Sequence, residues 1–392
     1  MNNQVFRVLL LVPLILLACG TFASAESSEI LLLQESVKEQ LDALGLAELT
    51  RYIERIEPDY QEFLPEMNWQ GIFRPGRLKF SFSDLLKKLL QSLFKEVLLS
   101  SHLMRQLLVI ALLSAFFNRL QLSLESTSMI NVAFAVCFLI VIFVGLQSFH
   151  AVCTIARNSI DEMVSFMYAL LPVLSTLLAA VGGVTSAAIF HPVLIMVVSG
   201  VAFLISTVLF PMLNVSAIIG LLSNFAQDFP LSRLDGLIKH LCTMLLSLVF
   251  TVFIGVVTVR GALAPIADGV GLRAAKFLTG TIVPVIGSMF ANAVEVVIGG
   301  SLLIKNTIGV FGLLIIFFFA ALPILKIWAV VLIYKVVGAL IEPICDKRIS
   351  EAISGLAGSL TLIMVSLATV ALMFFLAITI LVGFGNLTAA MR

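Results

Sequence analysis

Charge is scarce in this chain of 392 residues, and so are the motifs of common enzymes. Charged residues make up 12% of the sequence and apolar residues 60%, with a mean hydropathy of +1.12. This composition excludes an ordinary soluble domain. The formal net charge is +1, so no overall field would attract nucleic acid. The scarcity of charge therefore predicts a protein that lies mainly in a lipid bilayer.

Short motifs for catalysis and for metal or nucleotide binding are missing as well. The five cysteines are scattered, without a C-x-x-C pair or a cluster with histidine, which argues against a disulfide framework or a zinc site. The chain has no H-E-x-x-H, no G-x-S-x-G and no G-x-x-x-x-G-K-[ST] sequence. We therefore expect no enzymatic activity, no cofactor and no metal ion.

The charged residues that do occur are concentrated near the N-terminus. Of the 24 basic and 23 acidic residues, 22 lie between Glu26 and Ser100. This contrast predicts a water-facing helical domain at 26–100, followed by a membrane domain at 101–392.

A secretory signal peptide is predicted at residues 1–25. Arg7 precedes an apolar core at 8–18, and the small residues Ala23-Ser24-Ala25 form a cleavage pattern. A second interpretation stays open, because Leu16-Leu17-Ala18-Cys19 resembles a lipoprotein box that would leave Cys19 as a lipidated N-terminus. Either processing route places the charged domain outside the cytoplasm.

Within the charged domain, residues 82–97 have the pattern of an amphipathic helix. Such a helix either packs against its own domain, or lies on the membrane surface or on a partner subunit. The candidate contacts on its apolar face are Phe82, Leu86, Leu89, Leu93 and Val97.

The membrane domain is predicted to be all-α and polytopic, with about eight transmembrane helices. Residues 326–345 are either a ninth span or a helix in the interface. If both termini lie outside and residues 326–345 are interfacial, lysine and arginine favour the cytoplasmic loops by eight to four, which is the expected direction. The expected spans are about 103–121, 129–149, 164–184, 190–211, 238–259, 277–301, 306–325 and 359–385.

A duplication with an offset of 112 residues is a further hypothesis. The stretch 171–179 resembles 283–291, and Pro211 lies 112 residues before Pro323. A three-span unit would insert its two copies in opposite orientations, and broken segments in corresponding places of inverted repeats indicate a transport pathway. Two kinked packing helices are the alternative explanation.

Glu295 is the only carboxylate well inside a predicted span. An ionisable group at membrane depth is a functional candidate by default, although pairing with Lys305 or with a backbone group would make Glu295 structural. Proline removes a backbone hydrogen bond, and paired glycines permit close helix approach. The candidate pathway or pore residues are Glu295, Pro172, Pro284, Gly182, Gly183, Gly299 and Gly300.

Several stretches together carry a resemblance to a known family. They are the cleavage pattern, the charged helical segment, the Pro-Val spans at 171–184 and 283–300, the stretch from Arg260-Gly261 to Gly269-Val270-Gly271-Leu272-Arg273, and the final apolar span. In these features the sequence resembles the stage III sporulation protein AE family of endospore-forming bacteria. The resemblance identifies no catalytic residue.

What the resemblance implies is a location and a role. Such a protein is expected in the mother-cell membrane that faces the forespore, as a non-enzymatic subunit of a channel or secretion-like complex needed for late forespore gene expression. Its partners would be other membrane proteins of that complex and the lipid bilayer, and a homo-oligomer is compatible with this role.

A second function class stays open beside the channel-complex subunit. The chain could be a stand-alone permease that moves a small solute through the interface of the repeat. The charged N-terminal domain favours the channel-complex subunit, whereas the hypothesis of an inverted repeat favours the permease.

Overall fold

The computed structural model describes residues 82–121, 127–225, 231–282 and 286–390. These residues are helical almost throughout and contain no β-strand, which confirms the prediction of an all-α chain. The elements are α6 (Phe82–Leu99), α7 (Ser101–Gln121), α8 (Thr127–Ala180), α9 (Val184–Phe203), the π-helical segment η1 (Leu204–Leu209), α10 (Phe210–Phe225), α11 (Ser232–Ile282), α12 (Ile286–Ile341) and α13 (Lys347–Ala390).

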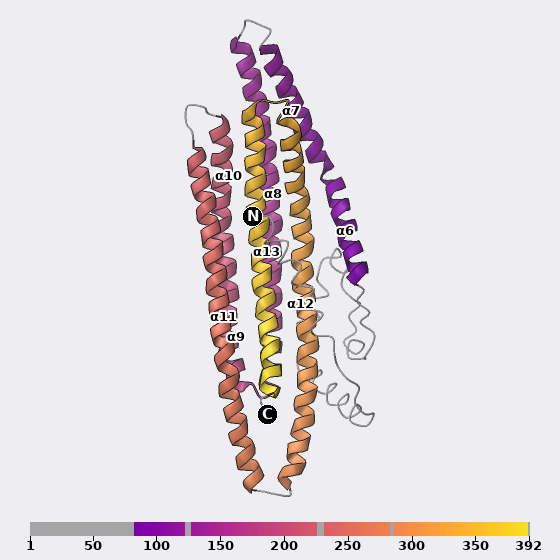
Figure 1. Cartoon of the computed structure of the whole chain (residues 1–392), viewed down its shortest axis with the longest axis vertical. Helices are drawn as coiled ribbons and strands as arrows, with labels where there is room; N and C mark the ends of the chain where they lie inside the picture. The colour runs from indigo at the N-terminus through magenta and orange to yellow at the C-terminus, as the bar shows by residue number, and fades with distance from the viewer. Residues whose placement is uncertain (1–81, 122–126, 226–230, 283–285, 391–392) are drawn as a thin grey trace.

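The long helices run up and down in an elongated bundle (Figure 1). Helix α8 has 54 residues, α11 has 51 and α12 has 56. At 1.5 Å per residue each is roughly 80 Å long, far more than the ~30 Å of a bilayer's hydrocarbon core. At the lower end of Figure 1, α11 and α12 extend beyond the end of α13.

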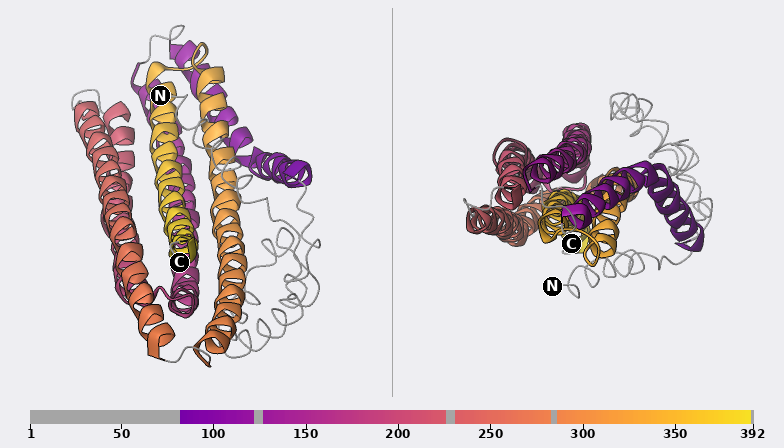
Figure 2. Two further views of the ribbon diagram at one scale, coloured as in Figure 1. Left: turned by 60° about the horizontal axis from the view of Figure 1, so that its bottom comes forward. Right: turned by 90° about the horizontal axis from the view of Figure 1, so that it is seen from above.

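Helix α13 lies at the centre of the bundle, in contact with α8, α10, α11 and α12 (Figures 1 and 2). Small residues allow this close approach. A Cβ on Gly145 of α8 would collide with the side chain of Leu356, and a Cβ on Gly309 of α12 would collide with Val382. The tight packing explains why more than half of the most apolar stretches of α12 and α13 is buried.

Six segments of the described chain are long and apolar enough to cross a membrane, whereas the sequence predicts about eight. The polytopic class is confirmed and the number of spans differs. The six are Lys87–Phe116, Ala135–Ala180, Val184–Phe225, Ser232–Val259, Val297–Ile341 and Lys347–Gly383.

Helix continuity explains the difference. The spans predicted at 129–149 and 164–184 lie largely in the single helix α8, because residues 150–163 are polar but contain neither proline nor glycine. Most of the span predicted at 277–301, the span at 306–325 and the segment at 326–345 fall in α12 in the same way. A hydropathy profile locates polar side chains, but it does not show whether the helix ends at them.

The two halves of the hypothetical repeat differ in their helices. Residues 129–180 form one helix, whereas the corresponding residues 241–292 are divided between α11 and α12. The duplication therefore stays a prediction from the sequence.

Helix α6 turns away from the bundle beyond its junction with α7 (Figure 2). It confirms a helix at the predicted place, and it lies against α12. Leu89 packs against the core of the bundle, and Leu93 and Val97 are half-buried. The side chains of Phe82 and Leu86 lie outside the described residues, as do the predicted signal peptide and most of the domain at 26–100.

Candidate functional site

The predicted pathway residues occupy different parts of the bundle. Pro172 is inside α8 with its ring exposed, and it does not end the helix. Gly182 has a φ of 94°, a conformation that favours glycine, and with Gly183 it forms the turn from α8 to α9. Glu295 is on α12, but its side chain and the whole of Pro284 lie outside the described residues.

Both predicted glycine pairs come to the same end of the bundle. Leu170 of α8 touches Gly312 of α12, where an added Cβ would lie 2.6 Å from the leucine Cδ2. The two helices are antiparallel. Twelve residues forward along α8 from Leu170 and twelve residues back along α12 from Gly312 therefore lead to the same level, at Gly182 and Gly300. Gly299 is half-buried and Gly300 is buried. At Gly183, an added Cβ would lie 2.9 Å from Leu178 Cδ1, so glycine is needed for the tight turn from α8 to α9.

Three groups with ionisable side chains occupy helix–helix contacts, and the first is Asp268. This carboxylate on α11 is 4% exposed and accepts hydrogen bonds from the backbone N–H groups of Thr185 (2.8 Å) and Ser186 (3.1 Å). It also accepts one from the Ser186 hydroxyl. An acid from another helix therefore satisfies the first free N–H groups of α9.

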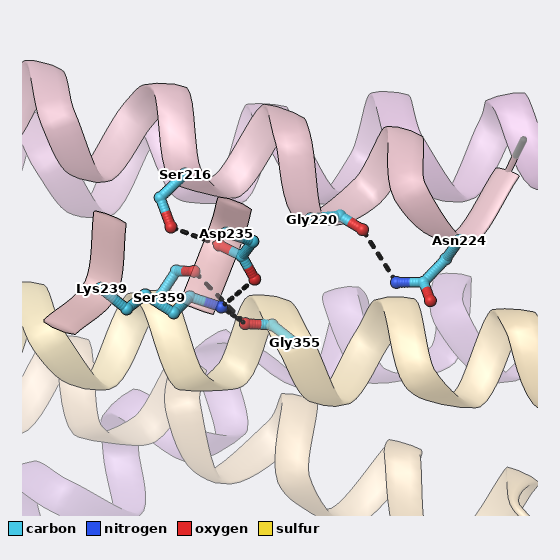
Figure 3. Close-up of polar contacts among 7 residues, drawn as sticks. All are labelled: Ser216, Gly220, Asn224, Asp235, Lys239, Gly355 and Ser359. Carbon is cyan, nitrogen blue, oxygen red and sulfur yellow. Dashed lines mark hydrogen bonds and ion pairs between the residues drawn. The ribbon is translucent and has the colours of Figure 1, made fainter. Parts of the chain in front are cut away.

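The second group joins three helices (Figure 3). Asp235 of α11 accepts a hydrogen bond from the Ser216 hydroxyl of α10. Its other oxygen pairs with the Lys239 ammonium at 2.8 Å, and Lys239 donates to the Gly355 carbonyl of α13 at 3.3 Å. Gly220 leaves room for the carboxylate, since a Cβ there would lie 3.1 Å from Asp235 Oδ2.

The third group is Lys305, which is fully buried. Its Nζ donates to the Val382 carbonyl of α13 at 2.8 Å. Lys305 therefore connects α12 to α13, and its pairing with Glu295 stays a prediction because the Glu295 side chain lies outside the described residues.

Pro211 explains the π-helical segment η1, which ends two residues before it. The Phe210 N–H bonds to the Ile205 carbonyl, five residues back. In this register the Ser206 carbonyl would pair with residue 211, which is a proline without an N–H. The Arg157 guanidinium of α8 donates to that carbonyl instead, at 3.1 Å. Arginine thus satisfies the backbone group that proline leaves unpaired.

Further polar contacts follow between α8 and α9. The Tyr168 and Ser199 hydroxyls are 2.6 Å apart, and the Ser175 hydroxyl lies 3.3 Å from His191 Nδ1. With the arginine contact they form an antiparallel ladder along the two helices. None of these residues was predicted as a site residue from the sequence. Arg157 falls between two predicted spans, and the others are single polar residues inside apolar spans, whose partners cannot be identified from the sequence.

The described residues hold no cluster of three or more histidine, cysteine or carboxylate side chains that could bind a metal. Asp235, Asp268 and Lys305 each join two or three helices. Such contacts set the arrangement of a membrane bundle and place charge at membrane depth, where ionisable residues generally belong to pathways or to buried pairs.

Comparison with known proteins shows where this bundle belongs. The model of the family described as stage III sporulation protein AE matches residues 67–385. The chain belongs to this family. A relative named stage III sporulation protein AE, from Bacillus subtilis (strain 168), is 34% identical over 370 residues, which cover 94% of this chain and 92% of the relative. No solved structure matches the chain.

Membership of the stage III sporulation protein AE family confirms the resemblance found in the sequence, and it supports a role in sporulation. The matched region contains all the helices of the bundle up to residue 385 of α13. The contacts of Asp235, Asp268 and Arg157 therefore all belong to the family region.

Proposed function

We propose that this protein is a non-enzymatic membrane subunit of the channel or secretion-like complex through which the mother cell sustains late gene expression in the forespore. It resides in the mother-cell membrane with domain 26–100 outside the cytoplasm. The observation that carries the proposal is the use of ionisable groups: Asp235, Asp268 and Lys305 hold helices together. They do not converge on a common reaction centre.

Docking of partners is assigned to α6. This helix turns its Leu89 side toward the bundle but leaves Phe94 67% and Leu98 72% exposed. It stands at an angle to the long axis of the bundle (Figure 2), and in the sequence it follows the charged N-terminal residues. Large exposed apolar side chains on such a helix suit contact with another protein or with the membrane surface.

Affinity purification from sporulating cells tests the proposal. The tagged protein is expected to bring other membrane proteins with it, whereas purification of the protein alone from cells that make normal spores would contradict it. Changing Phe94 and Leu98 to glutamate should remove the partners while the protein stays in the membrane, because neither side chain is part of the buried core. Gln91→Glu is the matched control, since it adds a charge at an exposed polar position of α6.

The stand-alone permease remains a second candidate, because buried ionisable groups such as Lys305 are typical of transport proteins. Reconstitution of the purified protein in liposomes separates the two. Solute flux through the protein alone would favour the permease, and flux only in the presence of co-purified partners would favour the channel subunit.

A further inference from the structure

The outward face of α8 changes from apolar to polar about half-way along the helix. In its first part it exposes large apolar side chains: Val132, Val136, Leu139, Ile140 and Phe143. From residue 147 to residue 180 it exposes no Leu, Ile, Val, Met or Phe. The exposed side chains there include His150, Thr154, Asn158, Asp161, Ser165 and Thr176.

These polar residues recur at intervals of three or four and form one stripe on the helix. Tyr168 and Pro172 fill the positions between Ser165 and Thr176, and both are exposed. From His150 to Thr176 the stripe rises about 39 Å along the axis, which exceeds the ~30 Å thickness of the hydrocarbon core. It is therefore long enough to cross a membrane from one side to the other.

Hydrogen bonds fix the height of this stripe relative to α11. Asp235 of α11 is level with Ser216, and Asp268 is level with Thr185. Between these two pairs, Val252 of α11 comes level with Ser199 of α9. Because Ser199 bonds to Tyr168, the middle of the stripe lies at the height of Val252.

At that height the outward faces of α11 and α9 expose large apolar side chains and no charged one, and the exposed serine and threonine hydroxyls of α11 bond back to carbonyls of the same helix. Val252 is 56% exposed, and its neighbour on the same face, Leu248, is exposed too. On α9, Met196 and Phe203 are also exposed. These side chains suit contact with lipid, whereas Asp161 and Asn158 would be costly there. The same level of the bundle thus has one side suited to lipid and one side suited to water.

We propose that the polar stripe of α8 lines a water-filled passage across the membrane, enclosed by several copies of this chain. The inference rests on the proposed function and names the surface that performs it. One helix face cannot enclose a passage by itself. Cyclic symmetry brings the same face of every copy to a common axis, which makes a continuous polar wall from one stripe.

The chemistry of the wall indicates what it conducts. Hydroxyl and amide side chains dominate, with Arg157 and Asp161 as a positive and a negative charge one turn apart. The guanidinium of Arg157 is held against the Ser206 carbonyl. In a cyclic assembly the Asp161 carboxylates form a negative ring and the Arg157 side chains a positive ring one turn away, so the two rings offset each other. Such a wall suits small hydrophilic solutes and selects weakly by charge.

Cysteine substitution tests the assignment in a variant whose five native cysteines are replaced and which still supports sporulation. Single cysteines are introduced at Thr154, Asn158 and Ser165 on α8, and at Leu248 and Val252 on α11 as controls at matched height. A membrane-impermeant thiol reagent should modify the α8 cysteines in intact cells and leave the α11 cysteines unmodified. Reaction at both helices would place this level outside the membrane, and reaction at neither would mean that lipid or another protein covers α8. Both outcomes overturn the proposal.

Cross-linking tests the enclosure by copies of the chain. A short bifunctional thiol reagent should join Asn158→Cys chains to one another and should not join Val252→Cys chains. If the thiols react singly but copies are never joined, the wall is not built from this chain. Co-purification of partners is measured on the same samples. If partners co-purify but copies are not cross-linked, the proposed channel-subunit function stands and only the proposed α8 passage is contradicted.

Discussion

Helices α8 and α11 have nearly the same length, and both are predominantly apolar, but the second part of α8 and the first part of α11 expose different kinds of surface. Helix α11 exposes a large apolar side chain on almost every turn between residues 234 and 259. Helix α8 exposes none between residue 147 and residue 180 apart from Tyr168. The polar residues of α11 that join helices, Asp235 and Asp268, point inward instead. The comparison shows that inward polar residues of a membrane helix join it to other helices, whereas outward polar residues determine which surface it exposes.

The largest effect is expected at the inward carboxylate of α11. Asp268→Ala would leave the N–H groups of Thr185 and Ser186 without their acceptor, at a cost of roughly 1–3 kcal/mol for the buried N–H of Ser186 and less for the part-buried N–H of Thr185. We expect a clear loss of membrane abundance and a lower thermal unfolding temperature in detergent. Asp268→Asn keeps one acceptor oxygen and should lose less. Equal stability of the alanine variant and the natural protein would show that this contact does not hold α9.

A somewhat smaller effect is expected from the ion pair on the same helix. Lys239→Met removes the ammonium and leaves Asp235, which is 14% exposed, with only the Ser216 hydroxyl. We expect a destabilisation of about 2 kcal/mol, and Asp235→Asn in the same chain should recover part of it by removing the unpaired charge. A double-mutant cycle on the unfolding temperature measures the coupling, and purely additive changes would mean that the pair contributes no coupling energy.

Two glycine substitutions compare the packed inner face of α8 with the outer face of α11. Gly312 of α12 faces Leu170 of α8, and Gly255 lies on α11. Gly312→Ala would press its Cβ against Leu170 of α8, so we expect a loss of about 1 kcal/mol. Gly255 of α11 has nothing within 4 Å of an added Cβ, and Gly255→Ala should be neutral or slightly stabilising because alanine favours the helix. Unfolding temperatures of the two variants in detergent check this order. The reverse order would contradict the packing of α8 on α12.

The smallest effect on stability, and the sharpest on function, is expected from outward substitutions. Ser165→Leu on α8 and Thr251→Leu on α11 both place leucine at an exposed position that lies at membrane depth. Neither should change membrane abundance by much. The α8 change should lower the yield of heat-resistant spores by narrowing the polar face, and the α11 change should leave it unaltered. Equal spore yields would remove the functional distinction between the two helices.

Much of the architecture was predictable from local pattern. Long apolar runs predict membrane helices because lipid offers no hydrogen-bond partners to the backbone, and the amphipathic periodicity of residues 82–97 predicts the helix that α6 forms. The number of spans was not predictable in the same way. Residues 150–163 are polar enough to suggest a loop, but they belong to an unbroken helix that exposes polar side chains such as Thr154, Asn158 and Asp161 and buries apolar ones on its other face.

The polar contacts were less predictable than the helices. Asp268 falls between two apolar runs and has no nearby partner in the sequence, since Thr185 and Ser186 are more than 80 residues away. The isolated carboxylate was the only available indication of its role. Arg157 and Pro211 are likewise far apart in the sequence, and only the shifted register of η1 connects them.

The amino-acid sequence by itself thus determined the all-helical membrane class, the place of α6 and the membership of a sporulation family. These follow from composition, from helical periodicity and from similarity along the chain, which are local or linear properties. Only the tertiary structure decided which polar residues of α8 and α11 face the interior and which face outward. The direction of a side chain depends on which neighbours pack against its helix, and those neighbours come from distant parts of the chain.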